Sequence, residues 1–198
     1  MHQHNPSLQE AIRLFDEANN ADPHHIEING QSLPYELFYA RCLSDWVEKL
    51  SPNASPALRL ASRCQHLCRW EIPRNSYPPT RAGYLQWRTE LKSFHAKKSG
   101  EILRQLGFPG EFIERVQTLN LKKNLAQDPE VQVLEDALCL VTLQYQLGDL
   151  IRKTDKEKMI SILQKTWKKM SPLAHQEALK LSYPPDQLAL IQEALAGA

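Results

Sequence analysis

Hydrophobic positions recur every three or four residues along most of the chain, which is the spacing of amphipathic helices. The alternating pattern of a half-buried strand is confined to residues 25–28. Gly107 follows the apolar run "ILRQL" as a helix stop. The pattern predicts an all-α fold of about eight or nine helices. Helix-starting residues precede several of these segments, namely Ser7 with Glu10, Ser32, Ser55–Pro56, Thr80, Ser171–Pro172 and Pro185–Asp186.

The length and composition predict a single compact domain over residues 1–198. Its 42% hydrophobic content is enough for a chain of this size to bury roughly 70% of its unfolded surface. The sequence contains no internal repeat and no low-complexity linker. We expect N-terminal helices in residues 1–50, a core in 55–152, and a C-terminal helical tail in 155–198 that packs on the core.

The sequence offers no sign of a membrane segment. It has no run of about 20 apolar residues, and "MHQHNPSLQE" lacks the charged and apolar regions of a secretory signal. Its 4 cysteines lie in apolar helical stretches, whereas a disulfide framework is denser and lies in loops. We therefore expect a cytoplasmic protein with no membrane partner. Its thiols should be reduced and mostly buried at Cys42, Cys64, Cys68 and Cys139.

The net charge of +1 hides one strongly basic segment. Residues 59–98 contain nine Lys and Arg residues but only Glu71 and Glu90 as acids. Guanidinium groups bind phosphate in pairs of hydrogen bonds, and aromatic rings stack on bases or sugars. The segment therefore predicts a phosphorylated small molecule, or less readily a nucleic acid, as the ligand. Its candidate contacts are Arg63, Arg69, Arg74, Arg81, Arg88, Trp70, Tyr84 and Trp87.

Two histidines in this segment occupy different helical positions. In a helix over about 56–70, His66 points away from the small apolar face that carries Cys64 and Cys68. In a helix over about 80–106, His95 shares a stripe with Arg88 and apolar residues. A hydrogen-bonded core histidine is the simpler interpretation of His95, and a ligand-binding histidine is the alternative.

A third helix, "VQVLEDALCLVTLQYQLGDL", is apolar around most of its circumference. Its polar sector contains Glu135, Thr142, Gln146 and Asp149, but Asp136 shares a stripe with leucines that should face the interior. An unpaired buried charge costs several kcal/mol. Asp136 should therefore be protonated, pair with an arginine or a helix terminus, or ligate a metal ion.

Four segments resemble an uncharacterised family of bacteria and fungi that is defined by a domain of unknown function. The resemblance spans most of the chain and implies an all-helical fold without implying an activity. It rests on "ELFYARCLSDWVEKLSPNASPALRLASRCQHLCRWEIPRNSYP", "GYLQWRTELKSFHA", "QVLEDALCLVTL" and "KTWKKMS".

More distantly, the chain is similar to the HD-domain metal-dependent phosphohydrolases. In that superfamily a His, a His-Asp pair and a later Asp lie on successive helices. His66, His95 and Asp136 reproduce this order, but His95 is followed by Ala96 instead of Asp. The resemblance therefore implies a site for one divalent ion such as zinc, iron or manganese, held by three protein ligands.

These observations lead to three hypotheses of function, and the sequence does not decide among them. The first is a divalent-metal-dependent phosphohydrolase that acts on a nucleotide or another phosphate ester, with the metal lowering the pKa of an attacking water. The second is an RNA- or tRNA-binding protein that uses the arginines and aromatics of residues 63–88. The third is a non-enzymatic helical binding or scaffold protein.

Overall fold

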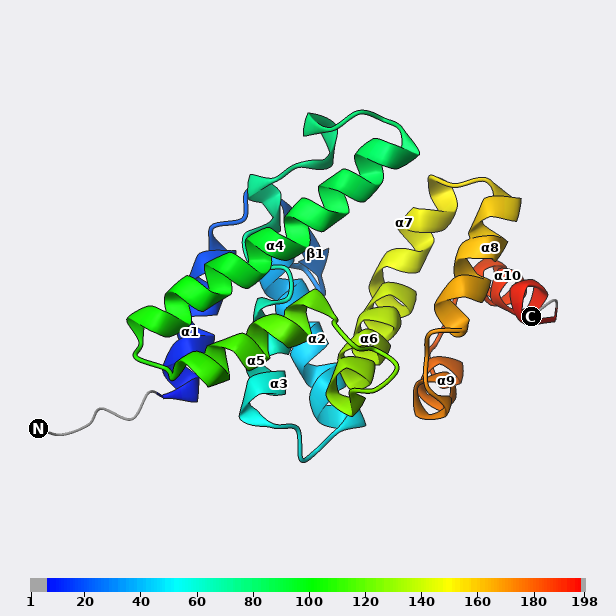
Figure 1. The fold of residues 1–198 in the computed structure, drawn as a ribbon. Helices are drawn as coiled ribbons and strands as arrows, with labels where there is room; N and C mark the ends of the chain where they lie inside the picture. Colours follow the sequence, from blue (N-terminus) through cyan, green and yellow to red (C-terminus); the bar gives the residue numbers. More distant parts are fainter. Residues whose placement is uncertain (1–6, 197–198) are drawn as a thin grey trace, which may run out of the picture.

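The computed structural model describes residues 7–196, and within this range the fold is almost entirely helical (Figure 1). The prediction of an all-α protein is confirmed, although the described residues form ten α-helices, slightly more than expected. The first half contains α1 (Leu8–Asn20), β1 (His25–Ile28), β2 (Gln31–Pro34), α2 (Tyr35–Leu50), α3 (Pro56–Cys64), two short 3₁₀ turns (Arg69–Glu71 and Arg74–Ser76) and α4 (Arg81–Gln105). The second half contains α5 (Gly110–Leu121), α6 (Pro129–Val141), the π-helical turn η3 (Thr142–Gln146), α7 (Leu147–Arg152), α8 (Lys156–Trp167), α9 (Pro172–Leu179) and α10 (Pro185–Ala196).

Side-chain caps fix several of these helix starts where the sequence predicts them. Ser55 Oγ accepts the Leu58 N–H at 3.1 Å, and Thr80 Oγ1 accepts the Gly83 N–H at 3.1 Å. Ser171 begins α9 in the same way. Each cap satisfies a backbone donor that has no partner inside the helix. Ser7 does precede α1, but its side chain makes no capping bond.

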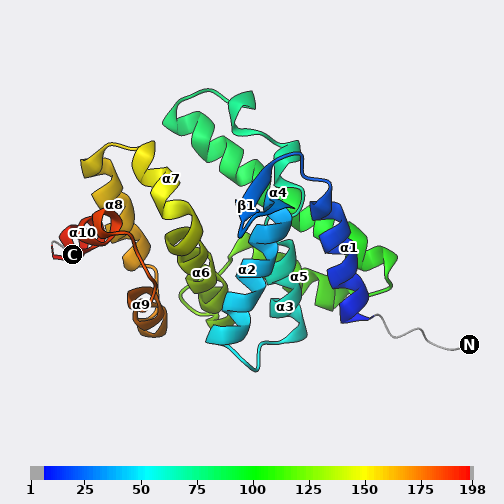
Figure 2. The same cartoon turned by 180° about the vertical axis from the view of Figure 1, so that it is seen from behind.

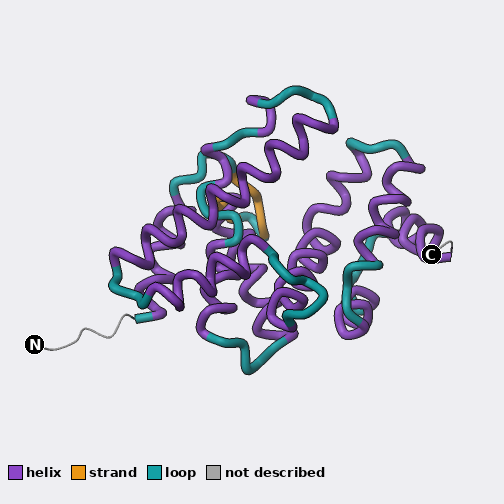
Figure 3. The backbone as a smooth tube through the Cα atoms, viewed as in Figure 1, coloured by secondary structure: helices purple, strands orange, loops and turns teal. Residues whose placement is uncertain are grey.

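The prediction of a helix start at Ser32 is wrong, because this residue lies in β2. The short strand predicted at residues 25–28 is confirmed as β1, and it pairs antiparallel with β2 (Figure 3). Asn29 and Gly30 join the strands with φ angles of 51° and 77°. Both residue types tolerate this left-handed conformation, which a two-residue hairpin turn requires. Helix α2 begins three residues after Ser32, where Asp22 Oδ2 accepts the Glu36 N–H at 2.9 Å.

One cluster of buried apolar side chains runs from Ala11 in α1 to Ala194 in α10. Helices α2, α3, α5 and α6 contribute fully buried leucines to its centre, among them Leu43, Leu58, Leu119 and Leu140. The C-terminal helices α8, α9 and α10 gather beside α6 and α7 in both views of the chain (Figures 1 and 2). The four cysteines are free and buried, as the sequence predicts. Within the described residues, no helix has the length and apolar character needed to cross a bilayer.

Two breaks in helical regularity set up the functional site. The helix predicted over 56–70 ends at Cys64, and Cys68 then adopts a left-handed conformation with φ of 54°. The helix predicted around residues 131–150 contains the π-helical turn η3 between α6 and α7. Each break changes the direction in which the following side chains point, so neither direction follows from a regular helical wheel.

Candidate functional site

A pocket of about 270 Å³ lies among α4, the turn after α3, the end of α5, α6 with η3, and the end of α8. We call it the cationic pocket, because five of its lining side chains are basic and only Glu135 is acidic. The basic residues are Arg69, Arg88, Lys92, Lys122 and Lys169. Its remaining polar lining includes His66, His95, Gln65, Thr142 and Gln146, and its aromatic lining is Tyr39, Tyr84 and Trp87.

One face of α4 supplies much of the pocket wall. Tyr84, Arg88, Lys92 and His95 follow one another at intervals of four, four and three residues, so they lie above one another on the helix. The Arg88 guanidinium donates a hydrogen bond of 3.1 Å to the Tyr84 hydroxyl. The sequence predicts this stripe through Tyr84, Arg88 and His95, and the structure adds Lys92 to it.

His95 is 3% exposed and has one nitrogen without a partner. Its Nδ1 lies 2.9 Å from the Leu67 carbonyl oxygen. Because a carbonyl only accepts, Nδ1 carries the proton and Nε2 has a free lone pair. Burial lowers the pKa of His95 to about 4, against the raising effect of the bond to Leu67. A neutral imidazole with an unpaired nitrogen therefore borders the cationic pocket.

His66 reaches the pocket from the turn that follows α3. Its ring stacks on Tyr39 with centroids 4.4 Å apart, and its centroid is 5.8 Å from that of His95. Its Nδ1 lies 3.5 Å from Glu36 Oε2. Burial, and then the charge of Arg69, lowers the pKa of His66 well below its ordinary value.

Glu36 lies behind His66 with 4% exposure. Burial raises the pKa of its carboxyl group to about 8, although Arg69 acts in the opposite direction. At neutral pH the contact between Glu36 and His66 is therefore between a protonated acid and a neutral imidazole, and it is not an ion pair.

The positive charges of the pocket are only partly neutralised. Glu135 Oε2 lies 2.8 Å from Lys122 Nζ, and Glu135 Oε1 lies 3.6 Å from Lys169 Nζ. Arg69 packs over the Trp87 ring at 4.9 Å from its centroid. Arg88 and Lys92 form no ion pair with any carboxylate of the described residues. Burial, followed by repulsion from Lys122 and Arg88, lowers the pKa of Lys92.

The π-helical turn η3 forms the opposite wall. Gln146 Nε2 donates to the Tyr35 hydroxyl at 2.6 Å, and Gln144 accepts from Trp46 Nε1 at 2.9 Å. These bonds tie the turn to α2 while Thr142 and Gln146 border the pocket. Of the polar sector that the sequence predicts, Glu135, Thr142 and Gln146 border the pocket, whereas Asp149 lies in α7 and pairs with Arg152.

Several predicted ligand contacts lie elsewhere. Arg63 forms a bidentate pair with Asp16 through bonds of 2.6 and 2.7 Å. Arg74 donates to the carbonyl oxygens of its own loop at 3.0 and 2.9 Å. Arg81 is exposed at the first turn of α4, and Trp70 packs against the core. Of the eight predicted contacts, the structure brings Arg69, Arg88, Tyr84 and Trp87 together in the pocket.

Asp136 does not join the two histidines. It is 3% exposed, and its Oδ1 accepts the Ser171 N–H at 2.8 Å and a Gln132 amide hydrogen at 2.9 Å. Of the partners that the sequence leaves open for Asp136, the structure shows a helix terminus, namely the start of α9. Asp136 is also absent from the pocket lining, where its neighbour Glu135 appears instead.

The predicted set of metal ligands is therefore not assembled. Within residues 7–196, no group of three or more His, Cys, Asp and Glu side chains has an arrangement that could hold a metal ion. The two histidines that do meet are surrounded by five cationic side chains, which would repel a divalent ion. The pocket does not fit a resident zinc, iron or manganese ion.

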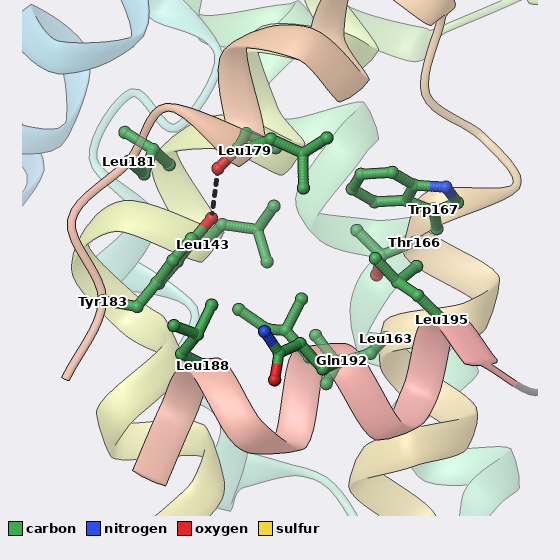
Figure 4. Close-up of a pocket in the computed structure, with 12 residues that line it drawn as sticks. Leu143, Leu163, Thr166, Trp167, Leu179, Leu181, Tyr183, Leu188, Gln192 and Leu195 are labelled. Carbon is green, nitrogen blue, oxygen red and sulfur yellow. Dashed lines mark hydrogen bonds between the residues drawn. The ribbon is translucent and has the colours of Figure 1, made fainter. Parts of the chain in front are cut away.

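A second cavity of about 220 Å³ lies between η3, α8 and α10 (Figure 4). Half of its lining residues are leucines, and none of them is charged. The Tyr183 hydroxyl at its edge donates to the Ala178 carbonyl oxygen at 2.9 Å. Of these two cavities, only the cationic pocket is lined by charged side chains.

Comparison with known proteins gives one match. A family model described as "Domain of unknown function (DUF4202)" matches residues 9–191. No curated protein and no solved structure matches the chain. The family has no assigned function, so a proposed function must come from the geometry of the pocket.

Proposed function

The chain belongs to the DUF4202 family, and we propose that this member binds a phosphorylated small molecule in the cationic pocket. The observation that carries the proposal is the convergence of five basic side chains, from α4 and three other parts of the chain, on one cavity with a single carboxylate. Like charges that are held together away from water repel one another, and folding must overcome this repulsion. A bound phosphate dianion would convert the repulsion into attraction.

Lys92 supplies the most direct support. Its ammonium group is half-buried, no carboxylate of the described residues pairs with it, and its pKa is lowered by burial and by Lys122 and Arg88. Arg88 also lacks an acidic partner among these residues. Arginine can grip two phosphate oxygens at once, and lysine adds a compact charge. The two residues are separated by one helical turn of α4, which suits contacts to one phosphate group.

The rest of the lining favours an ester of phosphate over the free anion. Tyr84 is 41% exposed and offers ring surface to a base or a sugar, while the buried Tyr39 and Trp87 add apolar lining. The unpaired Nε2 of His95 can accept a hydrogen bond from a hydroxyl group. A nucleoside or sugar monophosphate combines these features, and the volume of the pocket suits a ligand of small-molecule size.

Binding of single-stranded RNA is less well supported. Its backbone would need a row of free cations on an open surface. Arg63 and Arg74 are instead occupied by Asp16 and by loop carbonyls. The five basic side chains of the cationic pocket line a cavity instead of an open surface, which favours a small molecule.

The test is calorimetric titration with inorganic phosphate and with adenosine monophosphate at constant ionic strength. Arg88→Ala should weaken both affinities by about 10- to 100-fold, since it removes charge-assisted hydrogen bonds of roughly 1.5 to 3 kcal/mol. Arg81→Ala is the matched control, because Arg81 lies on the same helix outside the pocket. Absence of binding beyond that of chloride, or equal losses in the two variants, would contradict the proposal. Retention of a protein partner without phosphate binding would support the scaffold hypothesis instead.

A further inference from the structure

We propose that His95 is a catalytic nucleophile whose Nε2 accepts the phosphoryl group of the bound ester. The inference rests on the proposed function, because it requires a phosphate group in the cationic pocket. It goes further by assigning a covalent reaction, and it needs no resident metal ion.

The orientation of the His95 ring is the first support. The Leu67 carbonyl holds the Nδ1 proton at 2.9 Å, so the ring is fixed in one tautomer. The lone pair therefore lies on Nε2. This nitrogen has no hydrogen-bond partner, although His95 is buried with 3% exposure. A buried polar atom without a partner is rare and calls for an explanation. Attack on a bound ligand supplies one.

The surroundings of His95 suit the charge of the reacting group. Arg88 and Lys92 lie seven and three residues before it on the same face of α4, and Arg69 borders the same pocket. Preorganised cations stabilise the negative charge that spreads over the oxygens of a phosphoryl group during transfer. The neutral state of His95 at pH 7 keeps its lone pair available for attack.

Lys92 provides the proton that the leaving group needs. In the first step the Nε2–P bond forms and the P–O bond to the alcohol breaks. The alcohol oxygen takes a proton from the Lys92 ammonium, which becomes a neutral amine. Burial and neighbouring cations lower the pKa of Lys92, so this proton is released more readily than that of an exposed lysine.

Water completes the cycle. It attacks phosphorus, the P–Nε2 bond breaks, and the Lys92 amine takes the proton that water loses. His95 and Lys92 return to their starting states. The net reaction is hydrolysis of a phosphate monoester to an alcohol and inorganic phosphate, with no oxidant or reductant.

The first test is direct detection of phosphohistidine. The full chain is incubated with acetyl phosphate and analysed by intact mass spectrometry and peptide mapping. We expect one added phosphoryl group on His95, lost in acid and stable in base, as the phosphoramidate bond requires. His95→Asn should abolish the label, since asparagine keeps an N–H for Leu67 but lacks the nucleophilic nitrogen. His25→Asn, at an exposed position in β1, is the matched control and should keep it.

The outcomes separate the two proposals. Binding of inorganic phosphate without any label, a label that persists in His95→Asn, or a label on His66 would overturn the nucleophile and leave the binding site in place. Absence of phosphate binding by the wild-type chain would overturn the proposed function itself.

A second variant tests the role of Lys92. Lys92→Arg keeps the charge, but a guanidinium does not release its proton at ordinary pH. Hydrolysis of an alkyl phosphate should slow by about 100-fold or more, in the range of general acid catalysis. Hydrolysis of p-nitrophenyl phosphate, whose leaving group needs no proton, should slow much less. Equal slowing of both substrates would indicate a merely structural role for Lys92 and would overturn its assignment as the acid.

Discussion

Glu36 shows how one buried side chain makes stability depend on pH. Its pKa rises to about 8 from an ordinary value of 4.5, so between these values the folded chain holds a proton that the unfolded chain releases. Its contribution to stability is complete below pH 4.5 and is lost as the pH rises toward 8. His66 and His95 have lowered pKa values and act in the opposite direction below their ordinary value of 6.5. Because both histidines are still half protonated in the unfolded chain at pH 6.5, the effect of Glu36 is isolated by comparing the chain with a variant that lacks this carboxyl group.

We expect the Glu36 carboxyl group to lower the free energy of unfolding by about 1.5 kcal/mol between pH 6.5 and 8, at roughly 1.4 kcal/mol per pH unit while it stays protonated in the folded chain. Glu36→Gln should remove this slope, because glutamine is neutral at every pH. Urea denaturation at several pH values in this interval measures the effect. Glu27→Gln, at an exposed position in β1, serves as the control. A slope that survives in Glu36→Gln would show that another group titrates.

At the same scale, the sequence predicts some side-chain roles and misses others. The stripe of Tyr84, Arg88 and His95 follows from helical spacing alone, because α4 is regular there. Lys122 could not be assigned to the site in this way. It lies in a left-handed conformation just after α5, and its contact with Glu135 joins residues from different helices.

At the scale of elements, Asp128 holds the start of α6. Its Oδ1 accepts the Glu130 N–H at 3.0 Å, and its carboxylate pairs with Arg115 of α5, which lowers its pKa. The helix that begins here carries Glu135 into the pocket. A cap with a second partner on another helix therefore positions a wall of the site.

Asp128→Ala should lower the free energy of unfolding by about 1 to 2 kcal/mol, since it removes a cap and leaves two backbone donors without a partner. Asp128→Asn keeps a capping oxygen but not the charge that pairs with Arg115, so its loss should be smaller. Chemical denaturation near pH 7 compares the two variants. Equal losses would assign the stabilisation to the ion pair and not to the cap.

For helices and strands, the range of the stabilising contacts explains which elements the sequence predicts. Helices that begin at Ser55, Thr80 and Ser171 are predicted correctly, because the cap is a local interaction within a few residues. The strand β2 and the π-helical turn η3 are not, because each depends on partners outside its own segment. β2 requires β1, and η3 is held by Tyr35 and Trp46 of α2.

At the scale of the whole molecule, the cationic pocket exists only in the folded chain. Its basic residues come from the α3–α4 connection, α4, the end of α5 and the end of α8, so unfolding separates them. A ligand that binds only the folded state stabilises it, by about 2.7 kcal/mol at a concentration 100 times Kd.

Phosphate should therefore raise the melting temperature above its value in sodium chloride of equal ionic strength. Lys169→Ala removes one pocket charge and should reduce this increase. Lys168→Ala is the matched control, because Lys168 is the exposed neighbour outside the pocket. Differential scanning calorimetry provides the comparison. Equal increases in the two variants would mean that phosphate stabilises the chain through another site.

The sequence by itself determined the helical class, many helix starts and the uneven distribution of charge, because these follow from periodicity and contacts within a few residues. Only the tertiary structure decided that Asp136 accepts the Ser171 N–H at the start of α9 while Glu135 lines the cationic pocket. It also decided that Arg63 is occupied while Lys92, Lys122 and Lys169 share one cavity. Those outcomes depend on how helices distant in the sequence pack against one another, and no local pattern of residues encodes that packing.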